Sequence, residues 1–234
     1  MMLLKGFQKT TLLDYPGKVA CTVFTGGCNF RCPFCHNARL VTEQAQEEQI
    51  SEEEFFSFLK KRQGILDGVC VTGGEPLLQK DIVPFLAHIR ELGFCVKLDT
   101  NGSRPDVLKQ IMDAHLVDYI AMDLKNSKEK YARTCGLDAY PQAIEESIAL
   151  IMQSGVEYEF RTTVVREFHS AEDMVSMAKW IQGTPRYFLQ GFIDSGNLIG
   201  KGCSAYSPIE MKELLSLVIP IIPSASLRGV DDAT

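Results

Sequence analysis

The chain has 234 residues, a formal net charge of −6 at pH 7, and 45% hydrophobic and 23% charged residues. These values are typical of a soluble globular protein, and we expect one domain over residues 1–234 with a disordered tail at 230–234. An acidic chain without a basic stripe is poorly suited to bind a phosphate backbone, and no apolar run approaches the length of a membrane span. We therefore expect neither a nucleic acid nor a membrane as a partner.

Short apolar runs recur along most of the chain. They are rich in β-branched and aromatic residues and nearly continuous in hydrophobicity, as strands covered on both faces should be. The expected strands cover residues 19–25, 68–73, 94–100, 117–124, 158–165 and 186–192, with a final short strand at 224–229.

Helical patterns fill the intervals between these strands. Ser51 to Glu54 resembles a capping box, which opens a helix that carries Phe55, Phe58 and Leu59. The other expected helices cover residues 81–92, 105–114, 141–154, 171–182 and 210–218. Strands that alternate with helices imply an α/β fold with parallel pairing through right-handed crossovers. The alternation alone does not separate an open doubly wound sheet from a partial barrel.

Polar motifs follow four of the expected strands. They are the cysteine loop Cys28–Cys35, Gly73–Pro76, Asp99–Gly102 and Asp123–Lys125. In parallel α/β folds, ligands collect at the carboxyl ends of the strands. Four motifs at such ends therefore predict one functional site at this edge of the sheet.

The cysteine loop contains three thiols at spacing C-x3-C-x2-C: Cys28, Cys32 and Cys35. Three thiolates on a four-iron cluster leave one iron without a protein ligand, and an open metal position is typical of catalysis. A zinc site that adds His36 is the alternative, although sequence neighbours seldom reach one tetrahedral ion together. The other five cysteines are isolated, and we expect reduced thiols in a cytoplasmic protein. These isolated cysteines are Cys21, Cys70, Cys95, Cys135 and Cys203.

The cysteine loop after a first strand and Gly73-Gly-Glu-Pro76 after a second resemble the radical S-adenosylmethionine (SAM) superfamily. This resemblance implies a partial (β/α)6 TIM-like barrel of parallel strands with outer helices. It also implies one [4Fe-4S] cluster on the three cysteines, whose open iron is chelated by SAM. In that superfamily, one electron from the cluster cleaves SAM into methionine and a 5′-deoxyadenosyl radical.

Within the superfamily, the resemblance is closer to the glycyl-radical activating enzymes. The segments 6–19 and 26–37 are most similar to activating proteins of anaerobic ribonucleoside-triphosphate reductase. Pyruvate formate-lyase activating enzymes share the segments 35–37, 98–102 and 123–125. The resemblance implies that the radical removes an α-hydrogen from one glycine of a large partner enzyme. It further implies an electron donor such as flavodoxin or ferredoxin. The turn Asp14–Gly17 is either the docking edge for the partner or a simple turn.

The resemblance also assigns residues to SAM. It implies that Gly73, Gly74 and Glu75 hold the ammonium group, although a Gly-Gly-Glu-Pro segment can be a mere turn. It places Asp99 and Asn101 near the nucleoside and a cation, where the alternative is a strand-to-helix turn.

Further SAM contacts are implied after the later strands and in the cysteine loop. Asp123 and Lys125 point to one face of a strand end, where a solvated rim is the alternative. Arg161 fits the carboxylate of SAM or a structural ion pair. The remaining implied contacts are Phe34 beside adenine, with His36 and Asn37 as supporting groups.

One family feature is missing, and two other functions stay open. Certain activating enzymes carry a histidine after the sixth strand, where this chain offers Gln190 or Asp194 instead. His88, His115 and His169 are expected to be structural or solvated. A radical SAM enzyme for a small molecule would share the same motifs, and a zinc-binding interaction module would use the cysteines alone.

Overall fold

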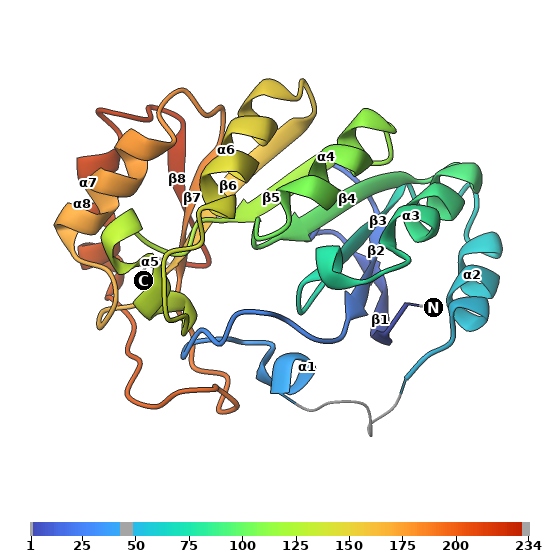
Figure 1. The fold of residues 1–234 in the computed structure, drawn as a ribbon, viewed down its shortest axis with the longest axis horizontal. Helices are drawn as coiled ribbons and strands as arrows, with labels where there is room; N and C mark the ends of the chain where they lie inside the picture. Colours follow the sequence, from blue (N-terminus) through green and yellow to red (C-terminus); the bar gives the residue numbers. More distant parts are fainter. Residues whose placement is uncertain (1, 43–48, 231–234) are drawn as a thin grey trace. The chain divides into compact units, whose positions relative to one another are not determined.

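The computed structural model describes residues 2–42 and 49–230 (Figure 1). Their contacts group them into two compact units. The first unit comprises the described residues of Met1–Asn29, Arg39–Ala121 and Ala143–Glu157. The second comprises Phe30–Ala38, Met122–Gln142 and the described residues of Tyr158–Thr234. The single domain stays a prediction, and residues 231–234 of the expected tail lie outside the described residues.

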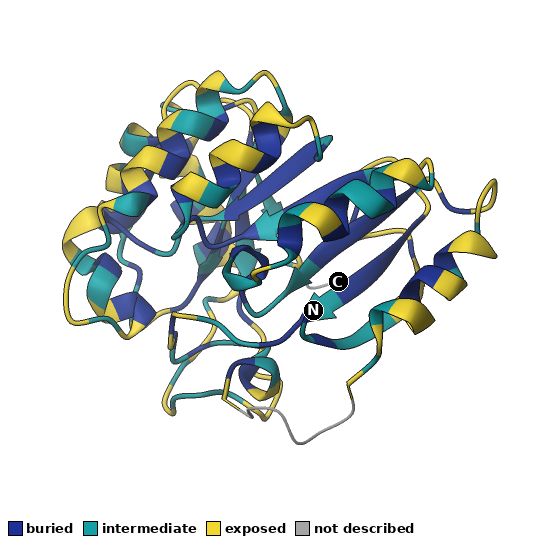
Figure 2. Cartoon of the chain, turned by 45° about the vertical axis from the view of Figure 1, so that its right-hand side comes forward, coloured by how far each residue is buried: buried dark blue, intermediate teal, exposed yellow. Residues whose placement is uncertain are grey.

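The strands of the first unit lie in the order β1-β2-β3-β4-β5. β1 pairs antiparallel with β2, whereas β2, β3 and β4 pair in parallel, as with Cys21 opposite Val69 and Val69 opposite Val96. Their bounds are Leu4–Thr11, Ala20–Thr25, Gly68–Gly73, Cys95–Thr100 and Tyr119–Asp123, the last of which begins in this unit. The apolar side chains of the central strands are buried, as their continuous hydrophobicity predicts (Figure 2).

The helices of the first unit are amphipathic, with buried and exposed residues in alternation (Figure 2). In α2 the Ser51 hydroxyl accepts a hydrogen bond from the Glu54 N–H at 3.0 Å, which satisfies one donor of the first turn. The helix buries Phe55 and Leu59 on one face. The bounds are α1 Ala38–Thr42, α2 Glu52–Lys60, the 3₁₀ turn η1 Pro76–Leu78, α3 Ile82–Glu91, α4 Pro105–Asp113 and α6 Ala143–Gln153.

The second unit has parallel strands in the order β6-β7-β8, with Phe160 opposite Tyr187 and Tyr187 opposite Ala225. Helices α7 and α8 pack side by side (Figure 1). Each begins with a capping box, at Ser170 and Ser207. The bounds are α5 Lys128–Cys135, β6 Glu157–Val164, α7 Ala171–Trp180, β7 Tyr187–Gly191, α8 Pro208–Val218 and β8 Ala225–Arg228.

The α/β class predicted from the alternation is confirmed, and each expected strand and helix is present with slightly different ends. Within residues 2–42 and 49–230, four elements were not expected: β1, α1, η1 and α5. β1, which was not among the strands expected to pair in parallel, runs antiparallel to β2. Within the described residues, no helix is long and apolar enough to cross a membrane.

Candidate functional site

The segment Cys32-Pro-Phe-Cys35 forms a tight turn in the second unit. The Cys35 N–H donates to the Cys32 carbonyl at 3.1 Å, and Pro33 occupies the position where a fixed φ favours a turn. The Pro33 carbonyl accepts a hydrogen bond from the Gly200 N–H at 2.8 Å, so a residue distant in the sequence stabilises the turn. Cys32 is buried and Cys35 is half-buried. The turn therefore fixes both cysteines of the C-x2-C half of the motif.

The two thiols of this turn differ in their electrostatics. A hydrogen bond with the Cys135 thiol lowers the pKa of Cys32; burial opposes this effect, and the charge of Lys125 assists it. Burial raises the pKa of Cys35, although Lys125 and the Asn37 N–H favour its thiolate. The Asn37 backbone therefore supports Cys35 directly. Lys125 acts on both thiols, so the turn and the segment after β5 belong to one electrostatic site.

Three charged side chains meet where β5 and β6 carry Asp123 and Arg161. The Arg161 Nε donates to Asp123 Oδ1 at 2.5 Å, and the Lys125 Nζ donates to Asp123 Oδ2 at 2.9 Å. Burial would raise the pKa of Asp123, but the two cations outweigh it and hold the pKa well below its usual range. Burial would likewise lower the pKa of Lys125, but Asp123 raises it. Two cations therefore contact one carboxylate, and guanidinium and ammonium groups are donors that also suit a bound carboxylate.

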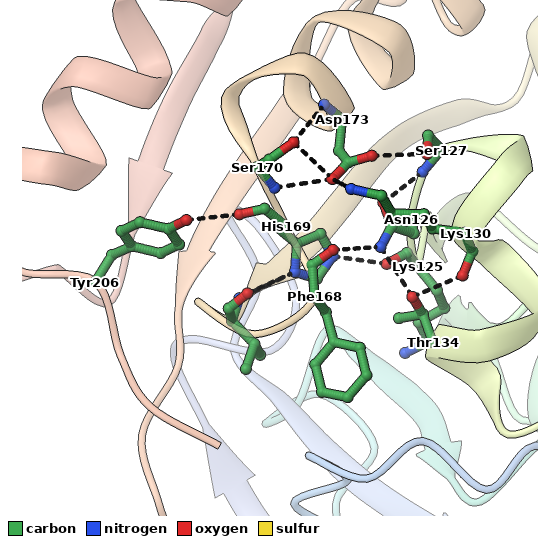
Figure 3. Close-up of polar contacts among 11 residues, drawn as sticks. Lys125, Asn126, Ser127, Lys130, Thr134, Phe168, His169, Ser170, Asp173 and Tyr206 are labelled. Atoms are coloured by element: carbon green, nitrogen blue, oxygen red, sulfur yellow. Dashed lines mark hydrogen bonds and ion pairs between the residues drawn. The ribbon is translucent and has the colours of Figure 1, made fainter. Parts of the chain in front are cut away.

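A polar network holds the backbone that follows β5 (Figure 3). The His169 Nε2–H donates to the Lys125 carbonyl at 2.8 Å, and Nδ1 accepts from the Val165 N–H at 3.0 Å. These contacts require the neutral ring, and burial lowers the pKa of His169. The buried Asn126 donates to the Phe168 carbonyl at 2.8 Å. His169 thus meets the expectation of a structural histidine, and it positions Lys125.

The same network joins the beginnings of α5 and α7 through Asp173. Its carboxylate accepts from the Ser127 hydroxyl at 2.9 Å and from the Lys130 ammonium at 2.5 Å (Figure 3). Asp173 also closes the capping box with Ser170. Burial would raise the pKa of Asp173, but these hydrogen bonds lower it.

Aromatic contacts hold two side chains of the cysteine loop, Phe34 between Cys32 and Cys35 and His36 directly after them. Phe34 is buried with its ring centroid 5.5 Å from that of Phe168 and 6.2 Å from that of His169. His36 lies over Phe192 with centroids 5.7 Å apart, and burial together with Lys125 lowers its pKa. The roles of Phe34 beside adenine and of His36 and Asn37 as supporting groups stay predictions.

In the first unit, the backbone of the Gly73–Pro76 segment lies very close to the backbone at and after the end of β2. A Cβ on Gly74 would lie 1.9 Å from the Gly27 carbonyl oxygen, and a Cβ on Gly73 would lie 2.4 Å from the Thr25 nitrogen. The buried Glu75 carboxylate accepts from the Leu77 N–H at 3.1 Å, the Thr100 hydroxyl at 2.8 Å and the Asn101 N–H at 2.6 Å. These contacts tie the end of β3 to the end of β4. A contact between Glu75 and an ammonium group stays a prediction.

The side chain of Asn101 contacts Cys28, the third predicted ligand of the cluster. Its Oδ1 accepts from the Ser103 N–H at 2.9 Å, which orients the amide so that Nδ2 faces Cys28 Sγ at 3.7 Å and Asn29 Oδ1 at 3.1 Å. Asp99, half-buried at the end of β4, forms an ion pair with the buried Lys97. The proximity of these residues to a nucleoside is still a prediction.

The predicted site residues thus form a group in each unit. The group of the first unit includes residues at the carboxyl ends of β3 and β4, and that of the second includes Asp123 at the end of β5 and Arg161 within β6. Among the residues that the structure describes, no three His, Cys, Asp or Glu side chains are gathered in a metal-binding arrangement. The role of Cys28, Cys32 and Cys35 as cluster ligands therefore rests on the sequence, and three unbridged thiols are the donor set that such a cluster requires. Sequence reasoning missed Cys135 and Lys97, because nothing in the linear pattern signals either contact.

Comparisons with known proteins identify the class. A sequence model of the radical SAM superfamily matches residues 22–181. A Methanocaldococcus jannaschii protein assigned as a glycyl-radical enzyme activating enzyme is 34% identical over 195 residues, covering 81% of this chain and 80% of the relative. A relative assigned as a GTP 3′,8-cyclase in Saccharolobus solfataricus is 31% identical over 129 residues, covering 52% of this chain and 39% of that protein.

The chain therefore belongs to the radical SAM superfamily, and it is a radical SAM enzyme. Within the superfamily it is a homologue of the glycyl-radical enzyme activating enzymes.

Solved structures support the fold. A domain of pyruvate-formate lyase-activating enzyme from Bacteroides vulgatus aligns with a TM-score of 0.58 at 18% identity, covering 69% of this chain and 99% of that domain. SuiB of Streptococcus suis bound to S-adenosylmethionine aligns with a TM-score of 0.65 at 16% identity, covering 87% of this chain and 48% of SuiB. At these identities the likeness concerns the fold alone, which is that of a partial TIM-like barrel.

Proposed function

We propose that this enzyme is an activase for a glycyl-radical enzyme. It binds SAM at a [4Fe-4S] cluster held by Cys28, Cys32 and Cys35, and the resulting 5′-deoxyadenosyl radical removes an α-hydrogen from a glycine of the partner. The observation that carries the proposal is the C-x3-C-x2-C loop inside the superfamily match, in a chain 34% identical to an assigned activating enzyme. We further propose anaerobic ribonucleoside-triphosphate reductase as the partner, flavodoxin or ferredoxin as the electron donor, and the cytoplasm as the location.

The residues of the site support this chemistry. A bound cluster would supply the electron that cleaves the sulfonium bond of SAM. The guanidinium of Arg161 and the ammonium of Lys125, which both contact Asp123, are donors that suit the SAM carboxylate. The lowered pKa of Cys32 favours the thiolate that iron requires, because the hydrogen bond with Cys135 outweighs burial.

The test is anaerobic reconstitution with iron and sulfide, followed by incubation with SAM, a reductant and a purified partner. We expect a cluster and a glycyl doublet in the EPR spectrum when the partner is anaerobic ribonucleoside-triphosphate reductase. The Cys32→Ala variant should lose both signals, whereas Cys203→Ala, at an isolated cysteine, should keep them. A wild-type preparation without a cluster would refute the proposal.

Two alternatives keep specific support. Pyruvate formate-lyase as the partner is favoured by the likeness to a domain of its activating enzyme, and it predicts a doublet only with that partner. A small-molecule substrate is favoured by the relative assigned as a GTP 3′,8-cyclase. It predicts SAM cleavage coupled to turnover of a small molecule, with no glycyl radical on either partner.

A further inference from the structure

Asn101 lies directly after β4, and the residue is 5% exposed. Its backbone N–H donates to the buried Glu75 carboxylate at 2.6 Å, which anchors it to the segment after β3. Its side-chain Oδ1 accepts from the Ser103 N–H at 2.9 Å, which closes a local turn. These two contacts determine where the Asn101 amide lies and which way it faces.

The nitrogen end of the same amide faces two acceptors of the first unit. Nδ2 carries two N–H groups and lies 3.1 Å from Asn29 Oδ1 and 3.7 Å from Cys28 Sγ. Sulfur is larger than oxygen, so the longer separation from Cys28 is that of an N–H···S hydrogen bond. A flipped amide would present its oxygen to the sulfur and would leave the Ser103 N–H facing a second donor. The contacts therefore assign an N–H donor to Cys28.

This donor matters because Cys28 is the first cysteine of the C-x3-C-x2-C motif. A cysteine that binds iron is a thiolate, which can only accept hydrogen bonds. Hydrogen bonds to ligand sulfurs are among the factors that set the reduction potential of iron–sulfur clusters. An N–H donor partly offsets the negative charge on the sulfur. The reduced cluster carries one more negative charge than the oxidised cluster, so the donor stabilises the reduced form more.

We propose that Asn101 is a positioning residue that donates an N–H···S hydrogen bond to Cys28 and thereby raises the reduction potential of the cluster. This inference rests on the proposed function, because it requires a cluster on Cys28. It adds a contact with a cluster ligand to the proximity to a nucleoside that the resemblance implies for Asn101. Because Glu75 holds the Asn101 backbone, one residue links the Gly73–Pro76 segment to the cluster ligand.

The first experiment compares Asn101→Ala, Asn101→Asp and Ser103→Ala after anaerobic reconstitution. Asn101→Asp keeps an oxygen for the Ser103 N–H but has no N–H donor. Ser103→Ala is the matched control, because it removes a hydroxyl of the same turn, which donates to Asn29 Oδ1 at 3.3 Å, and leaves the contact with Cys28 in place. We expect wild-type iron content in all three variants.

An EPR-monitored redox titration then measures the reduction potential. Asn101→Ala should lower the reduction equilibrium constant about tenfold, a shift of about 59 mV to more negative potential. Asn101→Asp should lower it further, because it adds a negative charge beside the sulfur. Ser103→Ala should keep the wild-type potential. If Asn101→Ala loses iron, Asn101→Asp decides the result, because it preserves the turn.

A second experiment tests the contact itself. Protein made with asparagine that carries ¹⁵N in its side-chain amide should show a ¹⁵N hyperfine coupling in the pulsed EPR spectrum of the reduced cluster. The coupling is expected because the hydrogen bond carries unpaired spin density from Cys28 Sγ to Asn101 Nδ2. Asn101→Asp should abolish the coupling, and Ser103→Ala should retain it.

The outcomes separate this inference from the proposed function. In a wild-type protein that carries the cluster, an unchanged potential in Asn101→Ala and Asn101→Asp would overturn the role of Asn101 alone. A ¹⁵N coupling that is absent, or that survives Asn101→Asp, would do the same. Equal shifts in Asn101→Ala and Ser103→Ala would also overturn it, because the turn and not the donor would then set the potential.

The proposed function fails in a different way. A cluster that shows the effect of Asn101 but does not cleave SAM would refute the proposed function and leave the hydrogen bond standing. A wild-type protein that binds no cluster would refute the proposed function, and the role of Asn101 with it.

Discussion

The Asp123 carboxylate forms ion pairs with two cations of the site, Arg161 and Lys125. The side chains of Arg161, Asp123 and Lys125 are 15%, 28% and 18% exposed, so their mutual repulsion is only partly screened by water. Replacing the carboxylate by an amide removes a counter-charge that both cations contact. We expect Asp123→Asn to lower the free energy of unfolding of the apoprotein by about 2 kcal/mol.

A matched substitution controls for the loss of one carboxylate. Asp106 pairs with Arg104 on the surface, where the two side chains are 64% and 40% exposed. Asp106→Asn should therefore cost less than about 1 kcal/mol. Urea denaturation at pH 7.5 measures both variants, and equal losses would contradict a special role for the ion cluster around Asp123.

His169 should make the stability of the apoprotein pH-dependent. Its pKa is lowered in the folded state by burial, so the unfolded chain binds the proton first as the pH falls. The stabilisation is complete above the unfolded pKa of about 6.5, and it is lost progressively as the pH falls from there towards the folded pKa. His169→Gln should reduce the change in urea midpoint between pH 7.5 and 5.5. His115→Asn, at an exposed residue, should preserve it, and the same pH profile in both variants would exclude His169 as its source.

At the scale of elements, the backbone contacts of β3 make a steric prediction. Gly74 donates its N–H to the Thr25 carbonyl at 2.9 Å, and Glu75 donates to the Gly27 carbonyl at 2.8 Å. A Cβ on Gly74 would collide with Gly27 backbone atoms at 1.9 and 2.6 Å, which no side-chain rotation relieves. We expect Gly74→Ala to destabilise the apoprotein by about 3 kcal/mol.

Gly93→Ala separates this collision from backbone strain. Gly93 has φ +88°, but a Cβ there would meet nothing within 4 Å. Its replacement should cost only the left-handed strain of about 1–2 kcal/mol. Thermal unfolding followed by circular dichroism compares the variants. If Gly93→Ala were the more damaging, close approach to Gly27 would not be the reason that position 74 requires glycine.

Strands and helices were predicted correctly where the sequence carries a clear hydrophobic pattern, and elements without such a pattern were missed. Strands such as 68–73 are buried apolar runs, and their parallel pairing follows from the helices between them. β1 reads Leu-Lys-Gly-Phe-Gln-Lys-Thr-Thr, with polar residues along an edge strand that has one paired neighbour, so no apolar run marks it. α5 buries Tyr131, Thr134 and Cys135 at helical spacing within a largely charged segment.

The missed helix explains which parts of the site were missed. The cysteine motif and the strand-end motifs are local patterns, so they could single out Cys32, Asp123 and Lys125 as candidates, whose roles stay predictions. The contact between Cys135 and Cys32 depends on where α5 ends, at a left-handed Gly136. The contact between His169 and the Lys125 carbonyl joins residues 44 positions apart. Such long-range contacts are set by packing and leave no periodic signal in the sequence.

At the scale of the whole molecule, the proposed ligands should stabilise the native state by mass action. A ligand that binds only the folded protein adds about 2.7 kcal/mol when its concentration is 100 times its Kd. Thermal unfolding of the reconstituted protein should therefore occur at a higher temperature when SAM is present at that excess, and removal of iron by a chelator should reverse the shift. Cys32→Ala should show almost no shift with SAM, because chelation by the open iron is expected to supply much of the affinity. A SAM-dependent shift of equal size in Cys32→Ala would locate SAM binding away from the predicted cluster, and the assignment of Cys32 as a ligand would fail.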